Sequence, residues 1–154
     1  MSYPRHIGTL ALLLPLTISL AACQTLGSAG LITSSVTTEL TPEAASSIAG
    51  DMVGRLAEQV GPGTNTIKLR TDDSVFGPAL ETSLREWGYA VVTDQKAEPA
   101  DTVPLAYVVD SYEGSVLARL STPDLDLTRM YQLGASGATP TSPLSVMQRG
   151  TGHR

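Results

Sequence analysis

Histidine, cysteine and aromatic residues are all scarce in this sequence. The chain has 154 residues, of which 5% are aromatic, so aliphatic side chains must form most of any core. The two histidines, His6 and His153, stand near opposite ends of the chain, and Cys23 is the single cysteine. These absences exclude serine–histidine and cysteine–histidine nucleophile pairs, the common zinc sites and an internal disulfide. We therefore predict no enzyme activity: no catalytic residue, no metal ligand and no cofactor.

Positive charge is also in short supply. Lysine and arginine number 10 against 15 aspartates and glutamates, which gives a formal net charge of −5. Loss of an N-terminal segment containing Arg5 would make the remaining chain more acidic. Because nucleic-acid binding depends on lysine and arginine contacts to phosphate, we expect no direct nucleic-acid partner and no polybasic contact with anionic lipid. No small-molecule substrate is expected either.

The few patterns that could suggest chemistry are weak. Asp72 and Asp73 lie on a predicted turn and lack the ligand spacing of a calcium loop. Asp110 and Glu113 flank another predicted turn, where solvated carboxylates are commoner than a glycosidase pair. Trp87 falls on the apolar stripe of a predicted helix, so we interpret it as a core residue rather than a ligand platform.

The longest hydrophobic run lies at the N-terminus. Arg5 and His6 precede an almost wholly apolar stretch over residues 7–22, which Pro15 interrupts. This stretch falls short of the roughly 20 apolar residues of a spanning helix, and a basic start with small residues at the end is typical of a secretory signal. Residues 1–22 are therefore predicted to be a cleaved signal peptide rather than a permanent transmembrane helix.

The run ends at Leu20, Ala21, Ala22 and Cys23, which resemble the lipobox of bacterial lipoproteins. The resemblance implies cleavage before Cys23, lipidation of its sulfur and acylation of its amine. Buried acyl chains contribute about 0.8 kcal/mol per CH₂, and a diacylated or triacylated cysteine supplies the two chains that stable anchoring needs. The alternative is an unmodified cysteine that follows a signal by chance. Gln24 resembles an outer-membrane sorting signal, so we expect an outer-membrane anchor and a domain facing the periplasm.

The remaining chain divides into a tether, a domain and a tail. Residues 23–40 are rich in Ser, Thr and Gly without a sustained period, which predicts a lipidated cysteine followed by a flexible tether. Residues 41–137 contain the periodic patterns and are predicted to form one domain. Residues 138–154 are again rich in Gly, Pro, Ser and Thr and are predicted to be a flexible C-terminal tail.

Two helices are predicted within the domain. The first begins at Thr41-Pro42-Glu43, which offers a capping hydroxyl, a proline at the first helical position and an acid in the first turn. Gly61-Pro62-Gly63 ends it, and an apolar stripe runs between at Ile48, Met52, Val53, Leu56 and Val60. A second helix is predicted from about Val75 to Trp87, with one apolar face.

Five strands are predicted around and after the second helix. Alternation and strong β formers place them over residues 66–70, 89–93, 103–112, 115–120 and 125–136. The order helix, strand, helix, strand and then three strands with short turns indicates an α+β fold. We expect two helices packed on one face of a small, mainly antiparallel sheet.

The strand over 103–112 indicates a contact surface. It is apolar on both sides for much of its length, and such strands are usually covered on both faces, whereas two helices can cover one face. We therefore expect the other face to be polar or covered by a partner. The possible partner surface comprises Val108, Tyr112 and an apolar island in the tail at Leu144, Val146 and Met147. The alternative is that these side chains are ordinary surface residues.

Several stretches resemble the conjugal transfer lipoprotein family TrbH of bacterial plasmids. They are residues 47–53, 55–59, 61–64, 87–95, 103–108, 117–121, 137–140 and 142–147. The resemblance attaches no chemistry to these residues. It implies a non-enzymatic structural or assembly component of the type IV secretion channel that moves plasmid DNA between cells. Such lipoproteins sit at the outer membrane and contact the periplasmic and outer-membrane ring proteins of the channel.

A second hypothesis belongs to another class of protein. A small α+β domain on a tether also suits a periplasmic lipoprotein that binds or regulates a cell-wall enzyme acting on peptidoglycan. Fold alone does not separate these two functions.

Overall fold

The longest helix, α1 (Pro42–Val60), begins and ends where the sequence predicts. In this computed structural model, which describes residues 33–63, 65–96 and 101–150, Thr41 caps the helix by accepting a bond from the Ala44 amide at 3.1 Å. Gly61 ends it with a φ of 82°. The predicted signal peptide and Cys23 lie outside the described residues. No helix within the described ranges is long and apolar enough to cross a membrane.

The second helix, α2 (Phe76–Glu86), also matches its prediction to within a residue at each end. Trp87 follows as the C-cap residue and is 45% exposed, so its predicted place in the core is wrong. The apolar stripe ends at Leu84, and Trp87 instead lies on the surface of α1. A Cβ at Gly54 would come within 3.3 Å of its ring, so this glycine leaves room for the indole.

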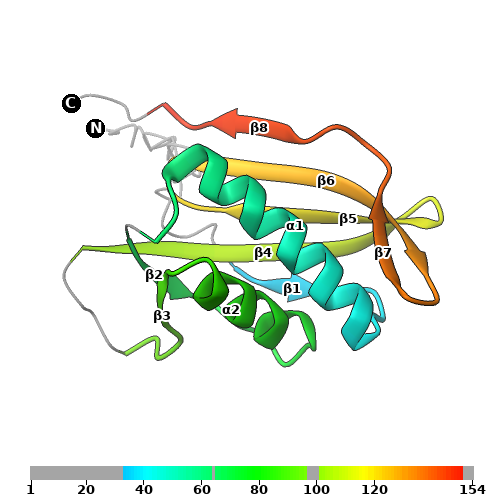
Figure 1. Cartoon of the computed structure of the whole chain (residues 1–154), viewed down its shortest axis with the longest axis horizontal. Coiled ribbons are helices and arrows are strands. Elements are labelled where there is room, and N and C mark those ends of the chain that lie inside the picture. The colour runs from blue at the N-terminus through cyan, green and yellow to red at the C-terminus, as the bar shows by residue number, and fades with distance from the viewer. Residues whose placement is uncertain (1–32, 64, 97–100, 151–154) are drawn as a thin grey trace, which may run out of the picture.

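The described strands form one mixed sheet of eight strands (Figure 1). The five predicted strands are β2 (Thr66–Leu69), β3 (Ala90–Val92), β4 (Thr102–Tyr112), β5 (Ser115–Ser121) and β6 (Leu125–Gly134). Three further strands, β1 (Ser35–Val36), β7 (Gly137–Pro140) and β8 (Ser145–Gln148), complete it. The path runs β3-β2-β4-β5-β6-β7, with β1 beside β4 and β8 beside β6.

The α+β class with two helices is confirmed, and the sheet is mixed: most of its pairs are antiparallel, as expected, but three are parallel. β2 pairs in parallel with both β3 and β4, and β1 pairs in parallel with β4. The strand–helix–strand unit β2-α2-β3 explains the parallel pair of β2 with β3, because a crossover helix brings its two strands side by side in the same direction. The pairs from β4 onward are antiparallel, as the short turns predict.

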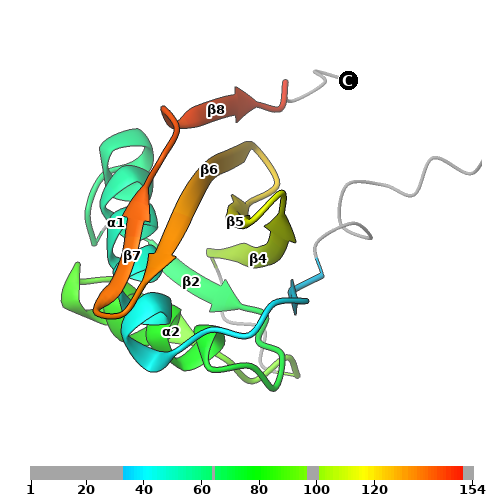
Figure 2. The same ribbon diagram turned by 90° about the vertical axis from the view of Figure 1, so that its right-hand side faces the viewer.

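The sheet curls around the helices, which lie together on its concave face (Figure 2). Leu105, Tyr107 and Val109 of β4 point to this side and enter the core. Most core side chains are aliphatic, and a few are aromatic. The rings of Tyr107 and Phe76 meet edge to face with centroids 5.0 Å apart. At the far edge, Gly137 at the start of β7 contacts Ser47 and Glu43, so the curled sheet reaches the first turns of α1.

Parts of the predicted tether and of the predicted tail are strands of the sheet. β7 and β8 pair with the two halves of β6, so a flexible tail over 138–154 is wrong for residues 138–140 and 145–148. β1 joins β4, which takes the end of the predicted tether over 23–40 into the sheet. These strands have two to four residues each, and their partners are distant in sequence. No local period therefore identifies them.

Candidate interaction surface

The convex face of the sheet carries three of the five residues predicted as a partner surface. Side chains alternate along a strand, so Val108 and Tyr112 point away from the face that buries Leu105 and Val109. Met147 lies on the same convex side, because it stands opposite Asp126, which in turn stands opposite Ser121 and Ala106. Tyr112 and Met147 are 58% and 56% exposed.

Apolar side chains of β5 and β6 extend this convex surface. Leu117 and Met130 stand opposite each other and are partly buried. Arg119 is exposed between Val108 and Thr128 in the neighbouring row. The convex surface thus combines apolar and charged side chains, as many protein interfaces do.

The other two predicted residues face the opposite way. Val146 stands opposite Leu127, a fully buried core residue, and is 40% exposed at the edge of the helix side. Leu144 is partly buried and packs against the core. The apolar island in the tail is therefore divided: Leu144 stabilises the fold, whereas Val146 and Met147 remain accessible on β8.

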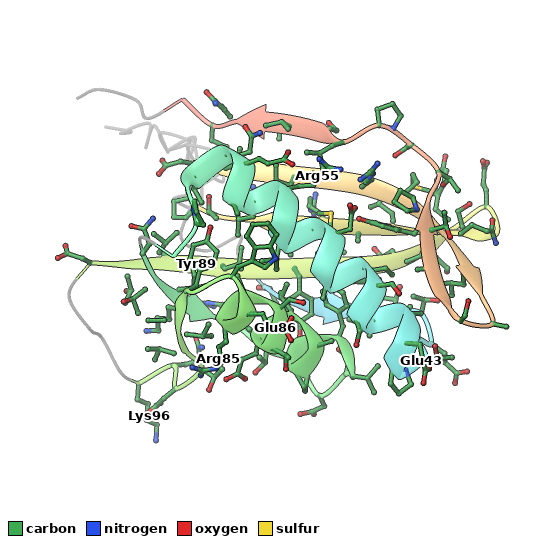
Figure 3. The ribbon with its side chains drawn as sticks, viewed as in Figure 1. Glu43, Arg55, Arg85, Glu86, Tyr89 and Lys96 are labelled. Carbon is green, nitrogen blue, oxygen red and sulfur yellow. The ribbon has the colours of Figure 1, made fainter. Side chains whose placement is uncertain are left out.

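The helix side of the domain carries several charged side chains (Figure 3). Arg55, Arg85 and Glu86 lie on the outward surface of α1 and α2. Arg55 pairs with Glu58 at 2.8 Å, and Arg85 pairs with Glu81 at 2.7 Å. The outward helix surface thus carries charges that pair within each helix, and the exposed Trp87 is an apolar side chain beside them.

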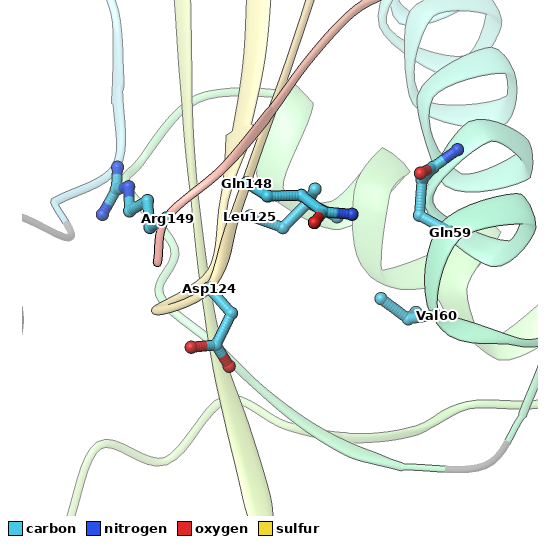
Figure 4. Close-up of a pocket in the computed structure, with 6 residues that line it drawn as sticks. All are labelled: Gln59, Val60, Asp124, Leu125, Gln148 and Arg149. Atoms are coloured by element: carbon cyan, nitrogen blue, oxygen red, sulfur yellow. The ribbon is translucent and has the colours of Figure 1, made fainter. Parts of the chain in front are cut away.

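A groove at the C-terminal end of α1 is a surface that sequence reasoning missed. One part holds about 280 Å³ between α1 and the end of β8 and is lined by Gln59, Val60, Asp124, Leu125, Gln148 and Arg149 (Figure 4). It shares Val60, Asp124 and Leu125 with an apolar hollow of about 190 Å³ that continues to Leu56, Asn65, Ile67, Val103 and Thr122. Together they form a channel on the surface, called here the end groove.

The geometry of the strands explains why the end groove exists. β5 ends at Ser121, opposite Ala106, so the first residues of β4 have no strand beside them on that edge. Pro104 lies in this stretch, where its missing N–H leaves no donor unpaired. The gap between the start of β4 and the turn at Thr122–Asp124 becomes the apolar hollow.

The mouth of the end groove is negative. The C-terminal end of α1 carries partial negative charge from its free carbonyls, and its last turn has no basic residue. The exposed Asp124 adds a carboxylate on the opposite wall. The arrangement suits a partner segment in which an apolar side chain stands next to a positively charged one.

A buried ion pair shapes one side of the groove. Asp126 is 4% exposed and accepts bonds from Arg149 Nε at 2.8 Å and Nη2 at 2.7 Å, and from the Ser121 hydroxyl at 2.5 Å. The Arg149 amide also donates to Asp124 O at 2.8 Å. This two-pronged contact fixes the end of β8 against β6, and it occupies Arg149, which therefore does not neutralise the groove.

A second cluster joins α1 to the sheet. Asp51 accepts two bonds from Arg129 at 2.8 and 3.0 Å and one from the Tyr131 hydroxyl at 2.6 Å. Arg129 also donates to Ser142 O at 3.0 Å, which ties in the loop between β7 and β8. Burial and then the bond to Asp51 raise the pKa of Tyr131. The sequence places Asp51 off the apolar stripe of α1, and its partners are far away in the chain.

Two of the acids that could have suggested chemistry, Asp72 and Asp110, accept hydrogen bonds from neighbouring side chains. Burial would raise the pKa of Asp72, but bonds from Ser74 and Tyr107 outweigh it and lower the pKa. Asp110 accepts a bond from the Thr37 hydroxyl beside β1. Within the described ranges, no three His, Cys, Asp or Glu side chains gather as a metal site would require.

The fold and these surfaces define a small α+β domain with a convex sheet face, a negative end groove and an exposed edge strand. The chain belongs to the conjugal transfer protein TrbH family, whose model matches residues 26–150. A relative from Sinorhizobium fredii described as "Probable conjugal transfer protein TrbH" is 53% identical over 135 residues, which cover 84% of this chain and 90% of the relative. The comparison with solved structures finds no match. The family supports a role in conjugation.

Proposed function

We propose that the protein is a lipid-anchored, non-enzymatic assembly component of a conjugative type IV secretion channel at the outer membrane. Family membership carries the proposal, because it ties the chain to conjugal transfer. The lipobox-like residues that end at Cys23 support the anchor. In this proposal the domain faces the periplasm and binds the ring proteins of the channel.

The start of the sheet sets the length of chain available to the proposed anchor. Ser34 donates to Arg70 O at 2.5 Å and accepts from the Tyr107 amide at 3.2 Å, so the chain is fixed from this residue onward. In this proposal residues 24–33, called here the leash, join Cys23 to the domain. At about 3.3–3.6 Å per residue, ten residues span at most some 35 Å.

The end groove and the convex face are the surfaces proposed for ring proteins. The end groove combines apolar walls at Leu56, Val60 and Leu125 with a negative mouth at Asp124. A segment with an apolar residue beside a lysine or arginine would fill the hollow and pair with the mouth. Such an anchor in a concave site with a polar rim is the usual arrangement of a protein-binding hot spot.

The anchor is tested by Cys23→Ser in the full chain. We expect loss of labelling by radioactive palmitate and release of the protein into the soluble periplasm, with Ser28→Ala in the leash as the matched control. Retention of label, or a mature N-terminus that mass spectrometry finds unmodified in the native chain, would contradict the lipid anchor.

The assembly role is tested by co-purification with the channel's ring proteins and by plasmid transfer. We expect the ring proteins to co-purify with the native chain, and a deletion strain to lose transfer until the gene is restored. Undiminished transfer in the deletion strain, with binding to purified peptidoglycan instead, would support the cell-wall hypothesis and reject this one.

A further inference from the structure

The fold places three unpaired cations on the convex side of the sheet. Lys68 of β2 stands opposite Pro104 of β4 and faces this side, since its neighbours on β2 enter the core. Arg70 continues the alternation, because its amide still bonds Leu105 O. Arg119 of β5 is exposed on the same side. Among the described residues, none of these three side chains makes an ion pair, and they are called here the convex cations.

Acids are few on this side, although the whole chain has a net charge of −5. Among the described strand residues that face it, only Asp110 and Asp126 are acidic. Asp126 is neutralised by its pair with Arg149. The cations of the helix side are by contrast all paired with carboxylates, namely Arg55, Arg85 and Arg129. The convex face is therefore a positive surface on an otherwise acidic domain.

Apolar side chains stand between the convex cations. Tyr112 and Met147 are exposed, and Val108, Leu117 and Met130 are partly buried on the same face. Lysine and arginine have long apolar stems that let the charged group reach outward while the stem covers apolar surface. A surface of this composition suits a lipid headgroup layer, where binding combines buried apolar area with attraction between basic side chains and anionic lipid.

The chain that leads to Cys23 leaves the domain beside this face. Ser35 of β1 stands opposite Val108, so its side chain lies on the convex side. The Ser34 hydroxyl before it donates to Arg70 O, which places the start of the described domain next to one of the convex cations. The leash spans at most about 35 Å from this point. A lipid surface that holds Cys23 would therefore stay within reach of the convex face.

We propose that, in the anchored protein, the convex face lies on the anionic lipid surface that holds Cys23. The inference rests on the lipid anchor of the proposed function. The convex cations contact lipid phosphate groups, and Tyr112 and Met147 lie at the boundary of the acyl chains. Both helices and the end groove then face away from the membrane, where ring proteins can reach the groove. Ring proteins that bind the convex face in the assembled channel would take the place of the lipid.

The separation of the charges explains how an acidic chain can make this contact. The outward acids of α1 and α2 lie beyond a helix layer about 10 Å thick, whereas charges at physiological salt act over about 8 Å. Repulsion from these acids is therefore screened, and the convex cations touch the surface directly. Each basic residue adds only a modest attraction, so three of them orient a domain that the anchor already holds close. Composition alone predicts no contact with anionic lipid, because it does not show on which face the charges lie.

The test places a fluorophore on either side of the full-length, lipidated protein in vesicles of phosphatidylethanolamine and phosphatidylglycerol. Ser145→Cys labels the convex face and Ser46→Cys labels α1; both serines are exposed. The lipidated sulfur of Cys23 does not react with the label. A nitroxide on the lipid headgroup should quench the fluorophore at position 145 at least threefold more strongly than the one at position 46. Equal quenching at the two positions would overturn the proposal.

A charge variant separates lipid contact from chance orientation. Arg70→Gln together with Arg119→Gln should abolish the difference between the two labels, and so should phosphatidylcholine in place of phosphatidylglycerol. Arg55→Gln on the helix side is the control and should leave the difference unchanged. A difference that survives either the double variant or the neutral lipid would also overturn the contact. Mass spectrometry that finds Cys23 unmodified would contradict the lipid anchor and the contact with it, whereas a lipidated chain with equal quenching contradicts the contact alone.

Discussion

At the scale of single residues, two glycines in helices stand in opposite surroundings. Gly77 in α2 lies against Tyr107, and a Cβ there would come within 2.8 Å of the tyrosine hydroxyl, whereas a Cβ at Gly50 in α1 would meet nothing within 4 Å. The hydroxyl also bonds Asp72 at 2.7 Å, so it has little freedom to move aside. The same substitution should therefore have opposite effects at the two positions.

Gly77→Ala is expected to lower the free energy of unfolding by about 1–3 kcal/mol, because the new methyl group displaces the Tyr107 hydroxyl. Gly50→Ala is the control and should raise it by roughly 0.5–1 kcal/mol through helix propensity. Urea unfolding followed by circular dichroism measures both. A Gly77→Ala variant as stable as the native protein would show that Tyr107 is not fixed where the structure places it.

Tyr107 also predicts how stability depends on alkaline pH. Burial, followed by its bond to Asp72, raises the pKa of Tyr107 to about 12 from its ordinary value of 10.0. Below pH 10 the phenol is neutral in both states and its stabilisation is complete. Between about pH 10 and 12 the unfolded chain ionises first, so stability should fall by roughly 2–3 kcal/mol in total. The pKa of Tyr131 is also raised, so its ionisation should lower the stability of the protein in the same direction.

The measurement is the urea midpoint at several values of pH between about 8 and 11.5, on either side of the ordinary tyrosine pKa, in the native protein and in Tyr107→Phe. The phenylalanine variant is expected to start less stable, because Asp72 loses a donor, and to decline less steeply above pH 10. Parallel curves for the two proteins would show that Tyr107 ionises as easily in the folded state as in the unfolded chain.

At the scale of elements, the cluster around Asp51 joins α1, β6 and the loop that leads to β8. Asp51→Ala would leave Arg129, which is 16% exposed, without its carboxylate. Unpaired partly buried charge costs several kcal/mol, so we expect a loss of about 2–4 kcal/mol and faster amide exchange in β8. Glu58→Ala is the control, because its pair with Arg55 is exposed and contributes about 0–1 kcal/mol. Equal losses in both variants would contradict the joining role of Asp51.

The sequence predicted elements where local rules decide the outcome. Thr41, Pro42 and Gly61 bound α1 through capping and backbone conformation, and alternation identifies β4 to β6. β1, β7 and β8 were missed because each is short and depends on an edge supplied by a strand elsewhere in the chain. The parallel pairing of β2 follows from the crossover rule, which the predicted order already contained.

The candidate surface was predicted only in part, for the same reason. Val108 and Tyr112 could be recognised because they lie on β4, which is apolar on both sides, and such a strand is usually buried on both faces. The end groove could not, since its walls come from α1, β4 and the turn before β6, and only the end of β5 opposite Ala106 creates the hollow. The pairs of Asp51 with Arg129 and Asp126 with Arg149 lie 78 and 23 positions apart, beyond the reach of helix or turn spacing rules.

At the scale of the whole molecule, the proposed function assigns partner recognition to the end groove. Val60→Asp places a carboxylate at the mouth of the groove without entering the core, because Val60 is 39% exposed. We expect plasmid transfer to fall at least tenfold while the free energy of unfolding stays within about 0.5 kcal/mol of native. Val75→Asp, at a similarly exposed valine outside the groove, should leave transfer within twofold. Unchanged transfer in Val60→Asp would remove the groove from the proposed function.

The short strand β1 is the part of the sheet that would separate first under tension on the N-terminal side of the domain. Only a few bonds hold it to β4, among them the Thr37 amide to Val109 O at 3.0 Å, whereas α1 and the strands behind it share the core. In the proposed lipid-anchored state, tension along the chain would reach β1 before the core, so these few residues would separate from β4 first. Release of β1 would lengthen the chain between Cys23 and the domain by on the order of 10–15 Å. The strand would pair with β4 again when the tension falls.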